Sequence, residues 1–181
     1  MKFNVPLLLA GGVVIGGLVY VLAAGFGKDP HEVPFMLTGK AAPDFKLERV
    51  DDKSPVTLAE MTQKPLILNF WSTWCMPCKA EHPVLEWGQK KFGDKVNFVG
   101  VIYQDTHENV DAFLKRQPPV YAQLFDEPGR AAVDYGLAGV PETYFISTDK
   151  VIRYKHVGPI NAETLASEIG KLLQAEEAHA K

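Results

Sequence analysis

An apolar run without any charge extends from Val5 to Phe26, after a single cation at Lys2. A helix of that length can cross a hydrocarbon core about 30 Å thick, at a rise of about 1.5 Å per residue. The pattern predicts a transmembrane helix over residues 5–26, and Lys2 favours a cytoplasmic location for residues 1–4. A cleaved signal peptide is the alternative, but its apolar core is usually only about 7–15 residues long, so we favour an uncleaved anchor.

Residues 28–43 show neither a helical nor a strand period, and they contain three prolines, Pro30, Pro34 and Pro43. This composition is typical of a tether rather than of a packed element. We therefore expect a linker over residues 27–39, followed by one domain of ordinary size over residues 40–181.

Beyond the linker, short apolar runs alternate with segments of helical period. The run from Pro65 to Trp71 is the clearest strand, since it is mostly apolar and stops at polar residues. Further strands are predicted at residues 96–103, 120–125, 143–146 and 151–156, and helices at 78–91, 108–116, 128–135 and after Asn161. This order predicts an α/β domain with a central mixed β-sheet covered by helices on both faces.

Composition and charge exclude one class of partner and leave one motif to explain. A net charge of −3 and the absence of a basic stripe argue against nucleic-acid binding. The only two cysteines, Cys75 and Cys78, lie in the segment WSTWCMPC at residues 71–78. Outside the cytoplasm, such a pair is driven to a disulfide unless something keeps reducing it.

The position of the two cysteines at the start of a predicted helix points to redox chemistry. A helix N-terminus stabilises a thiolate, and Cys75 comes first, where this field is strongest. Its pKa is expected to fall to about 3.5–7.5, which would make it the nucleophile. Cys78, one turn further along, is expected to be more buried and to resolve the mixed disulfide. Pro77 suits a first helical turn, and Trp74 is expected to shield the disulfide edge.

Two other uses of the thiol pair have weaker support. Cys75, Cys78 and His82 offer three ligands, whereas a structural zinc site normally needs four and usually a second pair. A purely structural disulfide would constrain the unfolded chain very little, because it closes a loop with only two intervening residues. We expect neither a metal nor any other cofactor.

Several motifs of the chain resemble those of a known family. WCMPC after an apolar strand, together with GVPET at residues 139–143, is similar to the thioredoxin-like proteins. The closer resemblance is to the DsbE/CcmG group, the membrane-anchored thiol–disulfide proteins of cytochrome c maturation. It rests further on GKAAPDF at 39–45, LNFW at 68–71, KAEH at 79–82 and IRYKHVG at 152–158. The resemblance implies a thioredoxin-like fold preceded by one transmembrane helix.

The resemblance also implies roles for individual residues. Pro141 would be a cis-proline packed against the cysteines, and the backbone beside it, at Val140, would pair with an extended substrate strand. Asn69 stands where general thioredoxins carry a buried aspartate, and an amide cannot exchange a proton. Glu81 and Glu142 are the candidates for that acid–base role, and either would raise the thiol pKa if it lay close to the sulfurs. Glu81 could equally be an ordinary exposed helix residue.

The sequence therefore predicts a dithiol reductant tethered by a single pass to the inner membrane, with its domain in the periplasm and Cys75–Cys78 as its redox-active disulfide. By resemblance, a transmembrane thiol carrier donates the electrons. The acceptor is then apocytochrome c or another thiol protein of cytochrome c maturation. The alternatives are a reductant for another exported protein or for a copper-site assembly factor, and a non-catalytic domain that binds a peptide around Pro141.

Overall fold

The computed structural model describes residues 5–25 and 37–179, and it separates two compact units, Met1–Pro34 and Phe35–Lys181. The first unit contains helix α1, Val5–Gly25. Within the described residues, no helix has both the length and the hydropathy needed to cross a membrane. Phe26, residues 1–4 and most of the expected linker lie outside the described residues. The transmembrane anchor therefore stays a prediction from the sequence.

Seven strands of the second unit form one mixed sheet in the order β2-β1-β5-β4-β3-β6-β7. The strands β3, β4 and β5 run parallel, whereas β1, β2, β6 and β7 join through antiparallel pairs. Their bounds are β1 Lys46–Arg49, β2 Pro55–Thr57, β3 Leu66–Trp71, β4 Asn97–Tyr103, β5 Ala122–Asp126, β6 Glu142–Ile146 and β7 Ile152–Val157. The mixed sheet predicted from the sequence is confirmed.

The helices of this unit are α2 Leu58–Met61, α3 Met76–Phe92, α4 His107–Arg116, α5 Arg130–Asp134 and α6 Ala162–His179. The pattern of the sequence did not indicate β1, β2 or α2. These elements have four, three and four residues, which is too short for a period to be visible.

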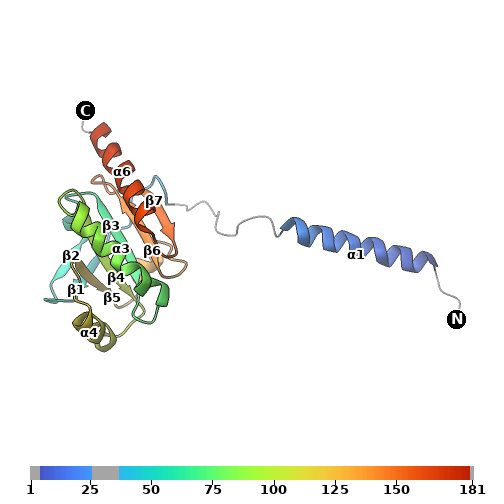
Figure 1. Ribbon diagram of the computed structural model, residues 1–181, viewed down its shortest axis with the longest axis horizontal. Coiled ribbons are helices and arrows are strands. Elements are labelled where there is room, and N and C mark those ends of the chain that lie inside the picture. Colours follow the sequence, from blue (N-terminus) through green and yellow to red (C-terminus); the bar gives the residue numbers. More distant parts are fainter. Residues whose placement is uncertain (1–4, 26–36, 180–181) are drawn as a thin grey trace. The chain divides into compact units, whose positions relative to one another are not determined.

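Side chains alternate between the two faces of the sheet, and helices cover both. On one face, Ile67, Phe98 and Phe145 pack against α3 and α6 through Leu85 and Leu165. The two helices also contact each other, as Figure 1 shows. The opposite face carries a second cluster, which includes Leu66, Leu68, Phe70, Tyr135, Tyr144 and Leu58. Because β3 is buried along its whole length, the loop that follows it has a rigid base.

Candidate redox site

The two cysteines lie where β3 ends and α3 begins. Cys75 is the N-cap of α3, and its sulfur accepts a hydrogen bond from the Cys78 backbone N–H at 3.1 Å. The two residues are joined by a disulfide. Pro77 lies in the first turn of α3 and is exposed. The helix N-terminus thus faces the first sulfur, which is the arrangement that stabilises a thiolate once the disulfide is reduced.

Both cysteines are well covered, and Cys75 is slightly more exposed than Cys78, in the order that the sequence predicted. Cys75 is 4% exposed and Cys78 is 0% exposed in the disulfide form.

In the reduced protein we expect an alkylating reagent to modify Cys75 much faster than Cys78, because Cys75 is the more accessible residue and its thiolate is stabilised by the helix N-terminus. Mass spectrometry of the protein during a short reaction measures the two rates. Equal rates would contradict the assignment of Cys75 as the nucleophile.

The end of β4 and the two residues that follow it, residues 103–105, contact the three residues that precede Cys75. The Ser72 hydroxyl donates to the Tyr103 carbonyl, and the Thr73 N–H donates to Asp105 Oδ2 at 2.6 Å. The Trp74 indole N–H donates to the Gln104 carbonyl at 2.9 Å, although Trp74 is 56% exposed. Three successive contacts therefore hold the redox loop against the end of β4.

Beneath the site, Trp71 is fully buried and packs in one cluster with both cysteines. Its indole N–H donates to Gln123 Oε1 at 2.8 Å. Gly100 lies directly under this bond, and a Cβ at that position would come within 2.2 Å of the Gln123 oxygen. The sheet therefore needs a glycine here so that Trp71 and Gln123 can meet.

The Val140–Pro141 peptide bond is cis, as the resemblance implies. The Val140 carbonyl oxygen lies 3.6 Å from Cys75 Sγ. Val140 is partly buried and packs against the cluster that contains the two cysteines. The loop that precedes β6 therefore forms one wall of the disulfide site.

Glu81 is buried rather than exposed, with 1% of its surface accessible. Its Oε1 accepts from Asn69 Nδ2 at 2.8 Å, and its Oε2 accepts from the Ile160 N–H at 2.9 Å. Asn69 Nδ2 also donates to Thr143 Oγ1 at 3.1 Å, while Asn69 Oδ1 has no partner among the described residues. Burial raises the pKa of Glu81 to about 7, against the lowering effect of the two hydrogen bonds. Glu81 is thus a buried carboxyl group with a raised pKa, about one helical turn after Cys78 on α3.

Glu142 is also buried, but it belongs to the other face of the sheet. It pairs in register with Phe70, whereas the neighbouring Thr143 pairs with Asn69. Its Oε2 lies 2.9 Å from Lys155 Nζ, and both side chains are almost inaccessible. The negative charge of Glu142 is therefore balanced by a cation, which opposes the like-charge effect on the thiols that the sequence suggested.

His82 is an apolar-packed residue in this structure. Its ring meets Trp71 edge to face with 4.6 Å between ring centroids, and burial lowers its pKa to about 4. Its Nε2 has no hydrogen-bond partner within the described part of the chain. The imidazole is therefore neutral near pH 7.

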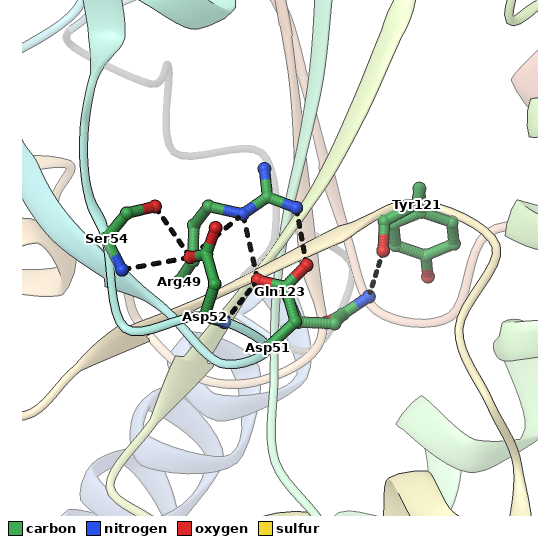
Figure 2. A network of polar contacts seen from close by, with 6 residues as sticks. All are labelled: Arg49, Asp51, Asp52, Ser54, Tyr121 and Gln123. Atoms are coloured by element: carbon green, nitrogen blue, oxygen red, sulfur yellow. Dashed lines mark hydrogen bonds and ion pairs between the residues drawn. The ribbon is translucent and has the colours of Figure 1, made fainter.

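A groove of about 780 Å³ lies beside α4 and the turn after β1, and neither cysteine lines it. An Arg49–Asp51 ion pair with an N–O distance of 2.7 Å holds its rim, and Gln123 contributes to its wall. Figure 2 shows Gln123 donating from Nε2 to the Tyr121 carbonyl, at 3.4 Å. Gln123 thus joins the groove to Trp71, behind the disulfide.

The structure brings together most of the residues that the sequence singled out. Cys75, Cys78 and Val140 meet at the disulfide, and Asn69 meets Glu81 behind it. Sequence reasoning missed further contributors, which are Thr143, Asp105, Gln123, Lys155 and Ile160. Thr143 lies in the GVPET motif and Lys155 in the IRYKHVG motif, so the resemblance could have pointed to both residues. The Ile160 contribution is a backbone N–H, which no side-chain pattern reveals.

Comparison with known proteins agrees with this geometry. The sequence model of the AhpC/TSA family matches residues 38–155. The thiol:disulfide interchange protein DsbE of Escherichia coli K12 is 34% identical over 171 residues, which cover 93% of this chain and 91% of that protein. HelX of Rhodobacter capsulatus, also named a thiol:disulfide interchange protein, is 34% identical and covers 93% of both chains.

A solved structure extends the agreement to the fold. The thiol:disulfide interchange protein of the thioredoxin family from Chlorobium tepidum superposes with a TM-score of 0.65 and 29% identity. The match covers 74% of this chain and 95% of that chain. The mixed sheet with flanking helices is thus a thioredoxin-like fold, and the chain belongs to the AhpC/TSA family, among the thiol:disulfide interchange proteins DsbE and HelX.

Proposed function

We propose that this thiol–disulfide oxidoreductase works as a dithiol reductant of protein disulfides. The observation that carries the proposal is the place of Cys75, at the N-terminus of α3 and 3.6 Å from the Val140 carbonyl beside the cis-proline. A helix N-terminus activates a thiolate, and the neighbouring backbone offers hydrogen bonds to an extended peptide. Thiol and substrate are therefore brought together at one edge of the domain.

The reaction proceeds by two exchanges. The Cys75 thiolate attacks one sulfur of the substrate disulfide, forms a mixed disulfide, and releases the other sulfur as a thiolate that takes up a proton. Cys78 then loses its proton and attacks Cys75 Sγ, which forms the Cys75–Cys78 disulfide and releases the second substrate thiol. Two electrons pass from the dithiol to the substrate, and a separate thiol donor must reduce the protein again.

Glu81 is the group that we assign to proton transfer at Cys78. It lies one helical turn after Cys78 on α3, is buried, and has a pKa raised to about 7. A base with that pKa can accept the proton of Cys78 at neutral pH. Asn69 and the Ile160 N–H hold the Glu81 carboxylate through hydrogen bonds. Asn69 therefore positions the proposed base, Glu81, and does not itself exchange a proton.

The proposed substrate is apocytochrome c or an intermediary thiol protein of cytochrome c maturation, with a transmembrane thiol carrier as the electron donor. Support comes from the resemblance to the DsbE/CcmG group and from 34% sequence identity to proteins named DsbE and HelX. The same proposal includes a single-pass anchor that places the domain in the periplasm. Its support is the uncharged run from Val5 to Phe26 in the sequence.

An exchange assay tests the proposed function. The reduced full-length protein is mixed with a synthetic peptide whose C-x-x-C-H segment, the form of a c-type haem attachment site, carries a disulfide. We expect the peptide to be reduced in step with oxidation of the protein, and we expect Cys75→Ser to abolish the reaction. Peptide binding without exchange in the wild-type protein would instead support the non-catalytic alternative. Preference for an unrelated exported disulfide would support another substrate.

A further inference from the structure

Lys155, on β7, contacts both the first residue of β6 and the loop before Pro141. Its Nζ lies 2.9 Å from Glu142 Oε2 and 3.3 Å from the Gly136 carbonyl oxygen. The side chain of Lys155 is 7% exposed and that of Glu142 is 0% exposed. A buried ion pair of this kind strongly penalises the loss of one partner, because the other charge stays buried without compensation.

Glu142 extends these contacts further along the same loop. Its Oε1 accepts from the Ala138 N–H at 3.2 Å, and its Oε2 accepts from the Tyr144 hydroxyl at 2.8 Å. The Tyr144 hydroxyl also lies 3.1 Å from the Tyr135 carbonyl oxygen. Backbone groups of Tyr135, Gly136 and Ala138 are therefore all tied to one buried network.

Geometry explains why a lysine suits this position. Lys155 pairs in register with Tyr144, and its Nζ lies 5.3 Å from the centroid of the Tyr144 ring. The ammonium group thus approaches the ring while it bonds both a carboxylate and a carbonyl. An apolar side chain at position 155 would lack both the charge that balances Glu142 and the donor that bonds the Gly136 carbonyl.

The loop held in this way ends at the wall of the disulfide site. It continues from Ala138 to Val140, whose carbonyl lies 3.6 Å from Cys75 Sγ. We propose that Lys155 is a positioning residue that, through Glu142 and the Gly136 carbonyl, fixes the 136–141 loop for binding an extended peptide disulfide. The inference rests on the proposed function, since the loop acts only if a peptide substrate docks there.

The test compares two substrates with the full-length protein. One is the C-x-x-C-H peptide disulfide, which needs the loop, and the other is hydroxyethyl disulfide, which has no peptide backbone. For Lys155→Met we expect kcat/KM with the peptide to fall about ten- to a hundredfold, as misplaced binding groups cause. With hydroxyethyl disulfide we expect a change of less than about twofold, because the chemistry at Cys75 is retained.

Lys171→Met is the matched control. Lys171 forms an ion pair with Glu168 at 2.6 Å, but its side chain is 67% exposed. The same chemical change there is expected to leave both substrates unaffected, since exposed pairs contribute little. Equal losses with both substrates in Lys155→Met, or no loss with the peptide, would overturn the positioning role. Failure of the wild-type protein to exchange with either substrate would instead refute the proposed function.

A double variant distinguishes the positioning of the 136–141 loop from the neutralisation of the Glu142 charge. Lys155→Met with Glu142→Gln leaves no unpaired buried charge, so it also serves if the single variant does not fold. The positioning role predicts that the peptide-specific loss persists in the double variant, because the Gly136 carbonyl still lacks its donor. Restoration of wild-type kcat/KM with the peptide would mean that Lys155 only neutralises Glu142.

Amide hydrogen exchange on the wild-type protein gives a readout that needs no variant. The Ala138 N–H is bonded to Glu142, so we expect it to be protected even though it lies in a loop. Exchange of that amide as fast as in an unstructured loop would overturn the proposal.

Discussion

Replacing Cys78 with serine is expected to stop turnover and leave the protein joined to its substrate through Cys75. The first exchange needs only the Cys75 thiolate, whose position at the N-cap of α3 is unchanged by this substitution. The second exchange needs a sulfur at position 78, and a serine hydroxyl cannot form the disulfide that releases the substrate. The mixed disulfide should therefore accumulate, visible by non-reducing electrophoresis and identified by mass spectrometry of the attached peptide.

Cys75→Ser is the matched control, because it removes the other sulfur of the same pair. That variant should capture nothing, since Cys78 is 0% exposed. Capture through Cys78 in Cys75→Ser, with none through Cys75 in Cys78→Ser, would reverse the two roles. In cells, the trapped partner would also identify the physiological substrate.

The second large effect concerns Glu81 and the pH dependence of stability. Its pKa is raised from 4.5 to about 7 in the folded protein. Between these values the folded state holds a proton that the unfolded state has released, so the free energy of unfolding falls as pH rises. At about 1.4 kcal/mol per pKa unit, the loss amounts to about 3 kcal/mol between pH 4.5 and pH 7.

His82 acts in the opposite direction over nearly the same range. Its pKa is lowered from 6.5 to about 4, so the folded protein gains stability as pH rises through this interval. The two residues are adjacent in α3, and their contributions nearly cancel in the wild-type profile. A comparison with Glu81→Gln is therefore needed to isolate the carboxyl group.

The free energy of unfolding of Glu81→Gln, minus that of the wild type, should increase by about 3 kcal/mol between pH 4.5 and pH 7. Denaturant unfolding of the two oxidised proteins at several pH values measures this difference. Asn69 can accommodate the new amide by rotating its side chain, which brings its unpartnered Oδ1 toward the introduced N–H donors. A difference that does not change with pH would mean that Glu81 does not titrate in this range.

The hydropathy pattern and one motif were sufficient to predict the α/β class, the mixed sheet and the redox pair. Runs such as Leu66–Trp71 are buried on both faces, so their apolar character is visible locally. The cysteines enter a helix whose start follows from the same local pattern, with Pro77 in its first turn. Local rules suffice for these features because the sequence signals, an apolar run and the start of a helix, are each contained in one short segment.

The short strands β1 and β2 could not be predicted in this way. Leu47 and Val56 are their buried apolar residues, and each strand is ordered by pairing with the rest of the sheet. The stability of such short strands comes from tertiary contacts rather than from their own sequence period.

The sequence by itself determined which residues carry the thiol chemistry, and the tertiary structure decided where the two glutamates lie and which groups they contact. From the sequence, Glu81 could be either an exposed helix residue or an acid–base group. The fold buries it against Asn69 and against the N–H of Ile160, which is 79 residues further along the chain. Glu142 was expected near the sulfurs, whereas strand alternation directs it to the other face and to Lys155. The physical reason is that a carboxyl group's pKa and role depend on its burial and on its partners. Those partners come from distant segments that only the folded sheet brings together.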